Sequence, residues 1–397
     1  MSIILKNANV ITMTDEKILQ NTDILITGDK IKSINSTITD AEVINCSGKY
    51  IIPGLADMHV HINLASDEDM KLFVANGITC VRNMNGSKSV LKMKEKTANE
   101  REFVCPLIYT STPILDGNPP VFPFNIVLET PEDAKTFIIK AKEDGYDFLK
   151  VYNNLKVSVY MEILKTARET GLDVIGHIPV AVGAEMAIEH GQYGFEHIKA
   201  LKRDQLAPAA KAGIYFTPTL IVQKMIRMIK ADEISEDMYN EDMMQYVSPD
   251  VIKRWRETVN FYKIHDFKLD RSFEEYVADA KVFLDFGGKL LAGTDTQNPF
   301  IIFGFSLHDE LELFAQSGIS CYEILKAATI NGSESNHQEK QWGTIQSGKL
   351  ANLVVLNSNP FENIRNTRDI NAVILKGEYY NRKALDGFLT QVAKSYL

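Results

Sequence analysis

The stretch Ile51-Ile52-Pro53-Gly54-Leu55-Ala56-Asp57-Met58-His59-Val60-His61-Ile62-Asn63 decides how the rest of the sequence is interpreted. An apolar run passes through a Pro-Gly turn into an expected strand that carries two histidines. Residues two positions apart on a strand point to the same face, so His59 and His61 are expected to lie side by side. Two neutral imidazoles held this close form half of a metal site. If the pair stood alone, two hydrogen-bonded histidines on a half-buried strand would be the better explanation. Residues on the other strands must therefore show whether a metal site is present.

Composition limits the classes of protein that the chain can represent. With 45% hydrophobic and 24% charged residues it has the composition of a globular domain. The net charge of −9 argues against a nucleic-acid partner, because no basic stripe neutralises phosphates. No apolar run approaches the length of a membrane span, and the N-terminus is too weakly apolar for a signal peptide. We therefore expect a cytoplasmic protein without nucleic-acid or membrane partners; a homo-oligomer is left open.

Four cysteines lack the CxxC spacing of a zinc knuckle and are expected to be buried free thiols in a reducing compartment. They are Cys46, Cys80, Cys105 and Cys321.

Strand and helix patterns divide the chain into three parts. Residues 1–52 and 343–397 are rich in strands, which predicts that both termini form one small, discontinuous β-sandwich domain. Between them, residues 53–342 alternate strands and helices. Including the opening stretch there are eight strand candidates, the others being 77–82, 105–111, 146–152, 172–177, 193–198, 213–219 and 289–295. This alternation predicts an α/β fold, a (β/α)8 (TIM) barrel.

Two segments between the strands have distinctive patterns. Thr130 is expected to cap a helix that has Pro131 at its first position and ends near Gly145. Residues 221–287 are too long for a simple connection, and their helical, Met-rich pattern predicts an insertion that forms a lid or a flank.

Metal-competent side chains recur at or near the carboxyl ends of five barrel strands. Each residue alone has an ordinary explanation. The aliphatic part of Lys150 could pack at a strand end, His177 could be a core histidine, and Asp295 could cap the next helix. Barrel enzymes, however, build their active sites at this end of the barrel from several strands. Together the residues predict a metal site, and they are His59, His61, Lys150, His177, His197 and Asp295.

The sequence also resembles the amidohydrolase superfamily, in its prolidase (Xaa-Pro dipeptidase) and imidazolonepropionase-like branch, nearly from end to end. The motifs that carry the resemblance are the opening stretch, 147–152, 176–177, 196–197, 217–220, 292–295, 307–313, 327–331 and 343–356. The resemblance implies that Lys150 is carboxylated and bridges two divalent ions, expected to be zinc. The four histidines and Asp295 would complete the coordination. The departures are Asn83, Asn352 and Asn331-Gly332-Ser333, none of which removes a ligand.

The chemistry of such a centre supports this interpretation. Two ions about 3.5–4 Å apart can hold a hydroxide and polarise a carbonyl oxygen together. Asp295 would take the proton of the hydroxide and pass it to the departing nitrogen. Tyr152 either donates to the developing oxyanion or fills the barrel as an aromatic side chain. Asp57 either orients a histidine or satisfies backbone groups, and the loop 116–120 either lines the pocket or is explained by its turn residues.

We therefore expect a metal-dependent hydrolase of carbon–nitrogen bonds that uses a metal-activated hydroxide. The expected substrate is a small amide, either a dipeptide with a C-terminal proline-like residue or an N-acyl amino acid. The alternatives are the hydrolysis of a cyclic amide, as in imidazolonepropionase-like proteins, and a non-catalytic scaffold of the same fold.

Overall fold

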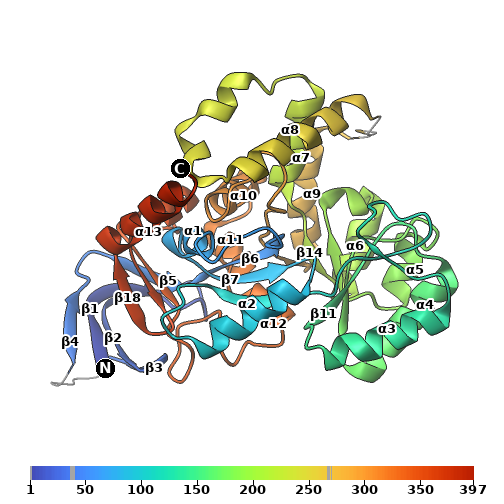
Figure 1. Cartoon of the computed structure of the whole chain (residues 1–397). Coiled ribbons are helices and arrows are strands. Elements are labelled where there is room, and N and C mark those ends of the chain that lie inside the picture. The colour runs from blue at the N-terminus through green and yellow to red at the C-terminus, as the bar shows by residue number, and fades with distance from the viewer. Residues whose placement is uncertain (1, 36–40, 266–268, 270) are drawn as a thin grey trace.

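Strands from both ends of the chain pair in one sheet, whereas the strands between them form parallel sheets with helices outside (Figure 1). The computed structural model describes residues 2–35, 41–265, 269 and 271–397. Residues 1, 36–40, 266–268 and 270, which belong to the predicted parts 1–52 and 221–287, lie outside the described residues. The mixed α/β class predicted from the sequence is confirmed.

The sheet of the two termini has eight strands in the order β18-β17-β16-β5-β1-β2-β3, and β4 pairs with β1. Antiparallel pairing of Ile52 with Val354 joins the two ends of the chain. Leu5, Val10 and Ile374 belong to the apolar core of this sheet. The strands are β1 (Ser2–Ile11), β2 (Ile18–Thr27), β3 (Lys30–Ile34), β4 (Glu42–Asn45), β5 (Tyr50–Pro53), β16 (Leu353–Leu356), β17 (Ile370–Leu375) and β18 (Glu378–Asn381). The sandwich and its domain boundaries remain predictions.

The parallel strands form a sheet of three, in the order β6-β7-β8, and a sheet of seven, in the order β10-β9-β11-β12-β13-β14-β15. All residues of β6 and β7 are buried, including polar side chains such as Asp57, His59 and Arg82. The bounds are β6 (Leu55–Val60), β7 (Ile78–Asn83), β8 (Leu107–Thr110), β9 (Leu115–Asp116), β10 (Ile126–Val127), β11 (Phe148–Val151), β12 (Asp173–Gly176), β13 (Gly194–Glu196), β14 (Tyr215–Thr217) and β15 (Lys289–Leu290).

Isolated parallel bridges join the ends of these two sheets. Ser111, just after β8, pairs with Phe148 of β11, and Val60 of β6 pairs with Thr296, beyond β15. Each end of the three-stranded sheet therefore contacts the seven-stranded sheet.

Helices follow most of the parallel strands. The predicted start at Thr130 is confirmed: its side chain and that of Asp133 form a capping box, and Pro131 begins α3. The helices outside the insertion are α1 (Met70–Ala75), α2 (Lys88–Asn99), α3 (Pro131–Glu143), α4 (Val157–Thr170), α5 (Gly183–Glu189), α6 (Arg203–Lys211), α10 (Phe305–Gln316), α11 (Cys321–Ala327), α12 (Ile330–Ser335) and α13 (Arg382–Ser395), with the short 3-10 helices η1 (Ile198–Ala200) and η4 (Ile364–Arg368).

The helical segment between β14 and β15 lies at the top of Figure 1 and contains α7 (Leu220–Lys230), η2 (Glu236–Asn240), η3 (Asp242–Tyr246), α8 (Pro249–Ile264) and α9 (Phe273–Asp285). Buried Glu310 accepts hydrogen bonds from the backbone N–H groups of Leu220 and Ile221, at 2.8 and 2.7 Å, and so holds the start of α7. Trp255 of α8 donates from Nε1 to the carbonyl oxygen of Gln297 at 2.9 Å. These contacts tie the segment to the chain around β15 and α10.

One strand prediction is wrong in length: β15 ends at Leu290, not at Asp295. Beyond it the backbone still contacts β6, because Met58 N–H donates to the Ala292 carbonyl and Asp295 N–H to the His59 carbonyl, at 2.8 and 2.7 Å. Further along this segment the backbone leaves the extended conformation, since Asp295 has a φ of +59°.

All four cysteines are free; three are buried, but Cys321 is only half-buried, so that part of the prediction is wrong. Among the described residues, no helix is long and apolar enough to span a membrane.

Candidate active site

The six predicted site residues lie at the same end of the parallel strands. His59 is on β6 and His61 just beyond it, Lys150 is on β11, and His177 and His197 directly follow β12 and β13. Asp295 lies beyond β15. Because parallel strands point the same way, their carboxyl ends meet at one edge, and residues far apart in sequence come together there.

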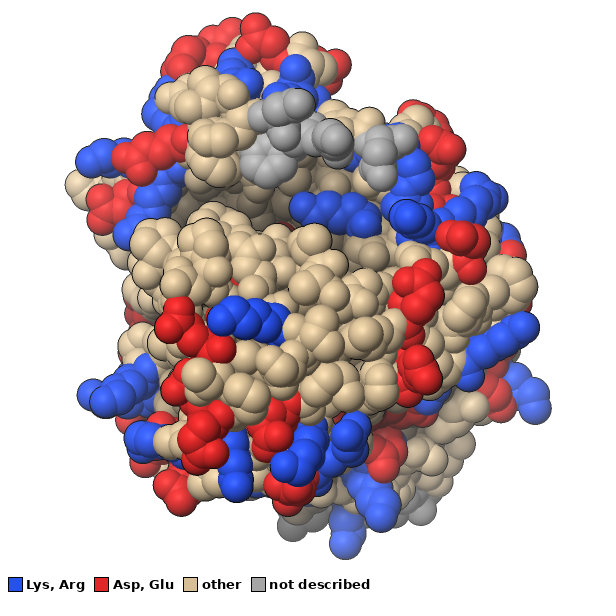
Figure 2. Space-filling model, turned by 90° about the vertical axis from the view of Figure 1, so that its right-hand side faces the viewer, with Lys and Arg blue, Asp and Glu red and all other residues tan. Residues whose placement is uncertain are grey.

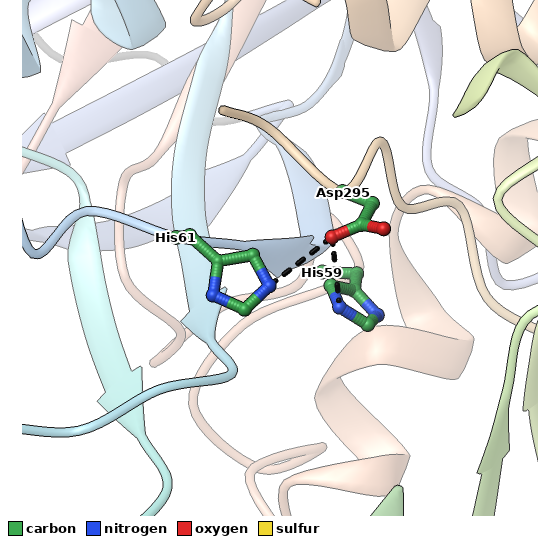
Figure 3. Close-up of side chains that lie close together, drawn as sticks. All are labelled: His59, His61 and Asp295. Atoms are coloured by element: carbon green, nitrogen blue, oxygen red, sulfur yellow. Dashed lines mark ion pairs between the residues drawn. The ribbon is translucent and has the colours of Figure 1, made fainter. Parts of the chain in front are cut away.

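Asp295 stands between the two histidines of the opening stretch (Figure 3). Its Oδ1 atom is 3.1 Å from His61 Nε2 and 3.3 Å from His59 Nε2. Candidate ligand atoms of these three residues all lie within 4.8 Å of one another. Two imidazole nitrogens and a carboxylate at this spacing suit a divalent ion such as Zn²⁺.

His177 and His197 extend this cluster. The His197 ring centroid is 4.8 Å from that of His59 and 4.8 Å from that of His177. Asp295 Oδ2 is 3.8 Å from His197 Nδ1. The four histidines therefore form one continuous group, with Asp295 against three of them.

Hydrogen bonds to Nδ1 orient three of these rings. His59 Nδ1 is 2.5 Å from Glu196 Oε2, His177 Nδ1 is 2.7 Å from Asn153 Oδ1, and His197 Nδ1 is 2.8 Å from Thr219 Oγ1. Such partners fix the ring and leave the other nitrogen for a metal. His59 Nε2 fits this pattern, since it is buried and has no hydrogen-bond partner among the described residues.

Glu196 and Arg82 form a buried network behind His59 that was not predicted from the sequence. Arg82 donates from Nη2 to Glu196 Oε1 at 2.8 Å and to Thr217 Oγ1 at 3.0 Å, and from Nε to the carbonyl oxygen of Met58 at 2.8 Å. The available signal was the position of Glu196 directly before His197. Burial raises the pKa of Glu196, but Arg82 and His59 outweigh it and lower the pKa below the ordinary value.

Lys150 is 1% exposed, which is unusual for a lysine. Burial lowers its pKa to about 8, although Glu196 and Asp295 oppose the change. The neighbouring strand gives it room at Gly176, where an added Cβ would lie 3.2 Å from Lys150 Cδ and 2.3 Å from the carbonyl oxygen of Val151. The site thus holds a lysine whose amine loses its proton easily.

The histidines of the cluster differ in charge. Burial and the Lys150 cation lower the pKa of His59, but Asp295 and Glu196 outweigh them and raise it above the ordinary value. Burial lowers the pKa of His61, and burial together with neighbouring cations holds the pKa values of His177 and His197 well below the ordinary value. These three imidazoles are therefore neutral, as ligands must be. Burial raises the pKa of Asp295, but His59 and the other histidines outweigh it and keep this carboxyl ionised.

The backbone is also unusual here, because His197 and Asp295 both have positive φ, +69° and +59°. Non-glycine residues with positive φ cost free energy and gather at functional sites. Gly293 lies beside this turn, and a Cβ there would come within 2.9 Å of His59 Cβ. Close approach of the two chain segments requires glycine at this position.

Tyr152 and Asp57 lie next to the cluster. The Tyr152 ring centroid is 4.0 Å from that of His177. Asp57 Oδ1 accepts the backbone N–H of Thr294 at 3.0 Å and that of His59 at 3.3 Å, and its Oδ2 accepts the Thr294 hydroxyl at 2.7 Å. Asp57 therefore satisfies backbone groups and fixes the segment that leads to Asp295.

The helical segment lines one side of a surface cleft. Figure 2 shows a hollow below the upper part of the molecule, where Figure 1 places α7 and α8. A cleft of about 540 Å³ separates Leu64, three residues after His61, from α8, and α8 contributes Asp250, Lys253, Arg254 and Glu257 to its wall. This cleft therefore lies between the loop after β6 and α8.

Residues 50–379 match the amidohydrolase family, so the chain belongs to this family. The 5-methylthioadenosine/S-adenosylhomocysteine deaminase of Caldanaerobacter subterraneus subsp. tengcongensis is 23% identical over 402 residues, which cover 90% of this chain and 85% of that protein. The imidazolonepropionase of Thermoplasma acidophilum is 23% identical over 384 residues, which cover 88% and 86%.

Among solved structures, bottromycin amidohydrolase has a TM-score of 0.82 at 20% identity and covers 99% of this chain and 90% of its own. A Xaa-Pro dipeptidase with bound methionine has a TM-score of 0.73 at 18% identity and covers 96% and 100%. These similarities show a shared fold. Family and relatives together show an enzyme that hydrolyses carbon–nitrogen bonds, in a family that generally uses divalent metal ions. The scaffold alternative is therefore set aside.

Proposed function

We propose that this enzyme hydrolyses the amide bond of a small, linear substrate with a carboxylate, either a dipeptide with a C-terminal proline-like residue or an N-acyl amino acid. The observation that carries the proposal is the convergence of four histidines, Lys150 and Asp295 at one end of the parallel strands.

Two groups of residues would hold two divalent ions, with zinc the expected metal. His59, His61 and Asp295 would bind one ion, and His177 and His197 the other. Lys150, carboxylated by CO2, would bridge them with two oxygens. The low pKa of Lys150 supports this role, since only a neutral amine adds to CO2. The hydrogen bonds to Nδ1 of His59 and His177 support metal binding through Nε2.

When bound, such ions polarise the scissile carbonyl group and lower the pKa of the attacking water. Asp295 would accept the proton of that water and deliver it to the departing nitrogen, because its ionised carboxylate faces the cluster. Burial raises the pKa of Tyr152, so its hydroxyl stays protonated and could donate to the developing oxyanion.

Lys199 supports a substrate with a carboxylate. It lies on η1, two residues after His197, and solvent reaches its side chain although protein atoms surround it. Its charge acts on Asp295, His177 and His197. The described part of the chain contains no ion-pair partner for it, so a substrate carboxylate could neutralise this cation.

The finer architecture belongs to the same proposal: β6, β7, β8 and β11–β15 would form the closed (β/α)8 barrel, with residues 53–342 as its domain and 221–287 as its insertion. The bridges at Ser111 and Val60 support closure. Similarity to an imidazolonepropionase keeps the hydrolysis of a cyclic amide as the second candidate.

The test is a panel of C-terminal-proline dipeptides, N-acyl amino acids and cyclic amides, assayed with the metal-loaded enzyme. We expect hydrolysis of the linear carboxylates. The variant Asp295→Asn should lower kcat by about 10²–10⁴, the range of a lost general acid/base, with a much smaller change in substrate affinity. Turnover of cyclic amides alone would favour the second candidate, and near wild-type turnover by Asp295→Asn would remove this residue from the mechanism.

The carboxylate preference has its own test. Lys199→Met should raise KM for the carboxylate substrates about tenfold, the effect of losing one charge-assisted contact, and should leave their C-terminal amides unaffected. Lys211→Met, an exposed lysine at the end of α6, is the matched control. Equal changes for acids and amides would contradict the role of Lys199.

A further inference from the structure

Three apolar side chains stand exposed on the loop between β9 and β10. Val121, Phe122 and Phe124 are 41%, 36% and 60% exposed. The two phenylalanine rings stack in parallel, with centroids 5.3 Å apart and an interplanar angle of 3°. Exposed apolar residues that occur singly are ordinary, but a contiguous group of them marks a surface that binds something.

Hydrogen bonds to one buried carboxylate hold this loop in place. Asp116 Oδ1 accepts the backbone N–H groups of Gly117 at 2.9 Å and Asn154 at 2.8 Å. Its Oδ2 accepts the N–H of Val121 at 2.8 Å and Asn125 Nδ2 at 3.0 Å. The aromatic rings are therefore presented on a loop whose backbone is fixed at both ends.

Ring contacts connect this loop to the proposed metal ligands. The Phe122 centroid lies 6.0 Å from that of Tyr152, and the Tyr152 centroid lies 4.0 Å from that of His177. Phe124, Phe122, Tyr152 and His177 thus form an unbroken row of rings, from the exposed loop to the proposed centre. A ligand group that lies on this row would extend from the loop toward the proposed centre.

We propose that Phe122, Phe124 and Val121 form an apolar subsite for an aromatic or large aliphatic group of the substrate, attached directly to the scissile amide. This inference rests on the proposed function and narrows its substrate class. Ligand pockets are lined mainly by apolar and aromatic side chains, and aromatic groups pack well against exposed rings. The occupant is the acyl group of the amide, and Lys199 provides the carboxylate contact for the other half of the substrate.

The experiment compares N-phenylacetylglycine with N-acetylglycine. For the metal-loaded wild-type enzyme we expect a higher kcat/KM for the phenylacetyl compound. Phe124→Ala and Phe122→Ala should each reduce that kcat/KM about tenfold, the size of one lost aromatic packing contact, and change the acetyl substrate less than about twofold. Phe124→Leu, which keeps an apolar side chain, should lose less. Phe286→Ala removes a ring that is 47% exposed at the end of α9 and should change neither substrate.

Calorimetry separates this inference from the proposed reaction. Both compounds are titrated into Asp295→Asn, with and without Phe124→Ala, so that binding is measured without turnover. Tighter binding of the phenylacetyl compound that is lost with Phe124→Ala supports the subsite even if the reaction is a different one. Equal binding of the two compounds, or equal losses for both on removing either ring, would overturn it. So would a change of oligomeric state in Phe124→Ala, which would make the rings a contact between copies of the chain.

Discussion

Glu196 Oε2 lies 2.5 Å from His59 Nδ1, in a pair of fully buried side chains. The other carboxylate oxygen accepts the Arg82 guanidinium at 2.8 Å. The histidine is therefore oriented by an anion that is itself held by a cation, and the unbonded Nε2 atom faces Asp295. Carboxylates behind metal-binding histidines commonly fix the ring and raise its basicity in this way.

Glu196→Gln should reduce metal affinity about 10–100-fold, because the neutral amide orients His59 less firmly and leaves Arg82 without its counter-charge. The measurement is the competition of the variant with a chelator for the metal. Glu185→Gln, an exposed glutamate on α5, is the matched control and should bind like the wild type. Unchanged affinity in Glu196→Gln would make the pair a purely structural contact.

The sequence allowed the prediction of the parallel strands and the gathering of the site residues, because short, mainly apolar segments alternate with helical patterns and carry polar side chains at or near their carboxyl ends. His59 and His61 needed only the two-residue period of a strand. Arg82 and Glu196 were missed as partners because their contact joins β7 to β13, and such pairing depends on tertiary packing. The early end of β15 was missed because the residues after Leu290 are still apolar and still bond to β6, although they form no regular strand.

Lys150 should make activation of the metal-free enzyme depend on pH. Burial lowers its pKa to about 8, so the fraction of neutral amine, the form that adds to CO2, rises as the pH rises through 8. Activation with Zn²⁺ at a fixed concentration of dissolved CO2 should therefore be faster at pH 9 than at pH 7. The rate should level off above the pKa. A rate that keeps rising toward the ordinary lysine pKa of 10.5 would show that this amine is not perturbed.

Gly293→Ala should destabilise the protein by about 1–3 kcal/mol, the usual cost of overpacking a buried site, and lower its metal content. The added Cβ would lie 2.5 Å from Thr217 Cγ2 and 2.9 Å from the Cβ of His59. Thermal unfolding and metal analysis measure the two effects. Gly387→Ala, in α13, is the control, because nothing lies within 4 Å of its new Cβ. This substitution should stabilise the protein by about 0.5–1 kcal/mol, since glycine in a helix is less favourable than alanine. A Gly293→Ala variant with normal stability and metal content would contradict the close packing described here.

Trp255→Phe should raise KM about three- to tenfold while leaving metal content unchanged, the effect of one lost hydrogen bond. The substitution keeps most of the packing but removes the bond from α8 to the Gln297 carbonyl, two residues beyond Asp295. Trp342→Phe is the control, because it also loses an indole hydrogen bond, to the Tyr109 hydroxyl. The measurement is the steady-state KM of both variants. If the KM of Trp255→Phe equals that of Trp342→Phe, the helical segment does not shape the substrate site.

Lys150, four histidines and Asp295 are proposed to hold two divalent ions. The direct measurement is the metal content of the purified wild-type protein and of Lys150→Ala. The mass of the intact wild-type protein shows in addition whether Lys150 is carboxylated. We predict close to two ions per chain and a carboxylated lysine in the wild type. The variant should lose most of its metal and activity, and short carboxylic acids should restore part of the activity. One tightly bound ion per chain with an unmodified Lys150 would rule out a centre of two ions bridged by a carboxylated lysine.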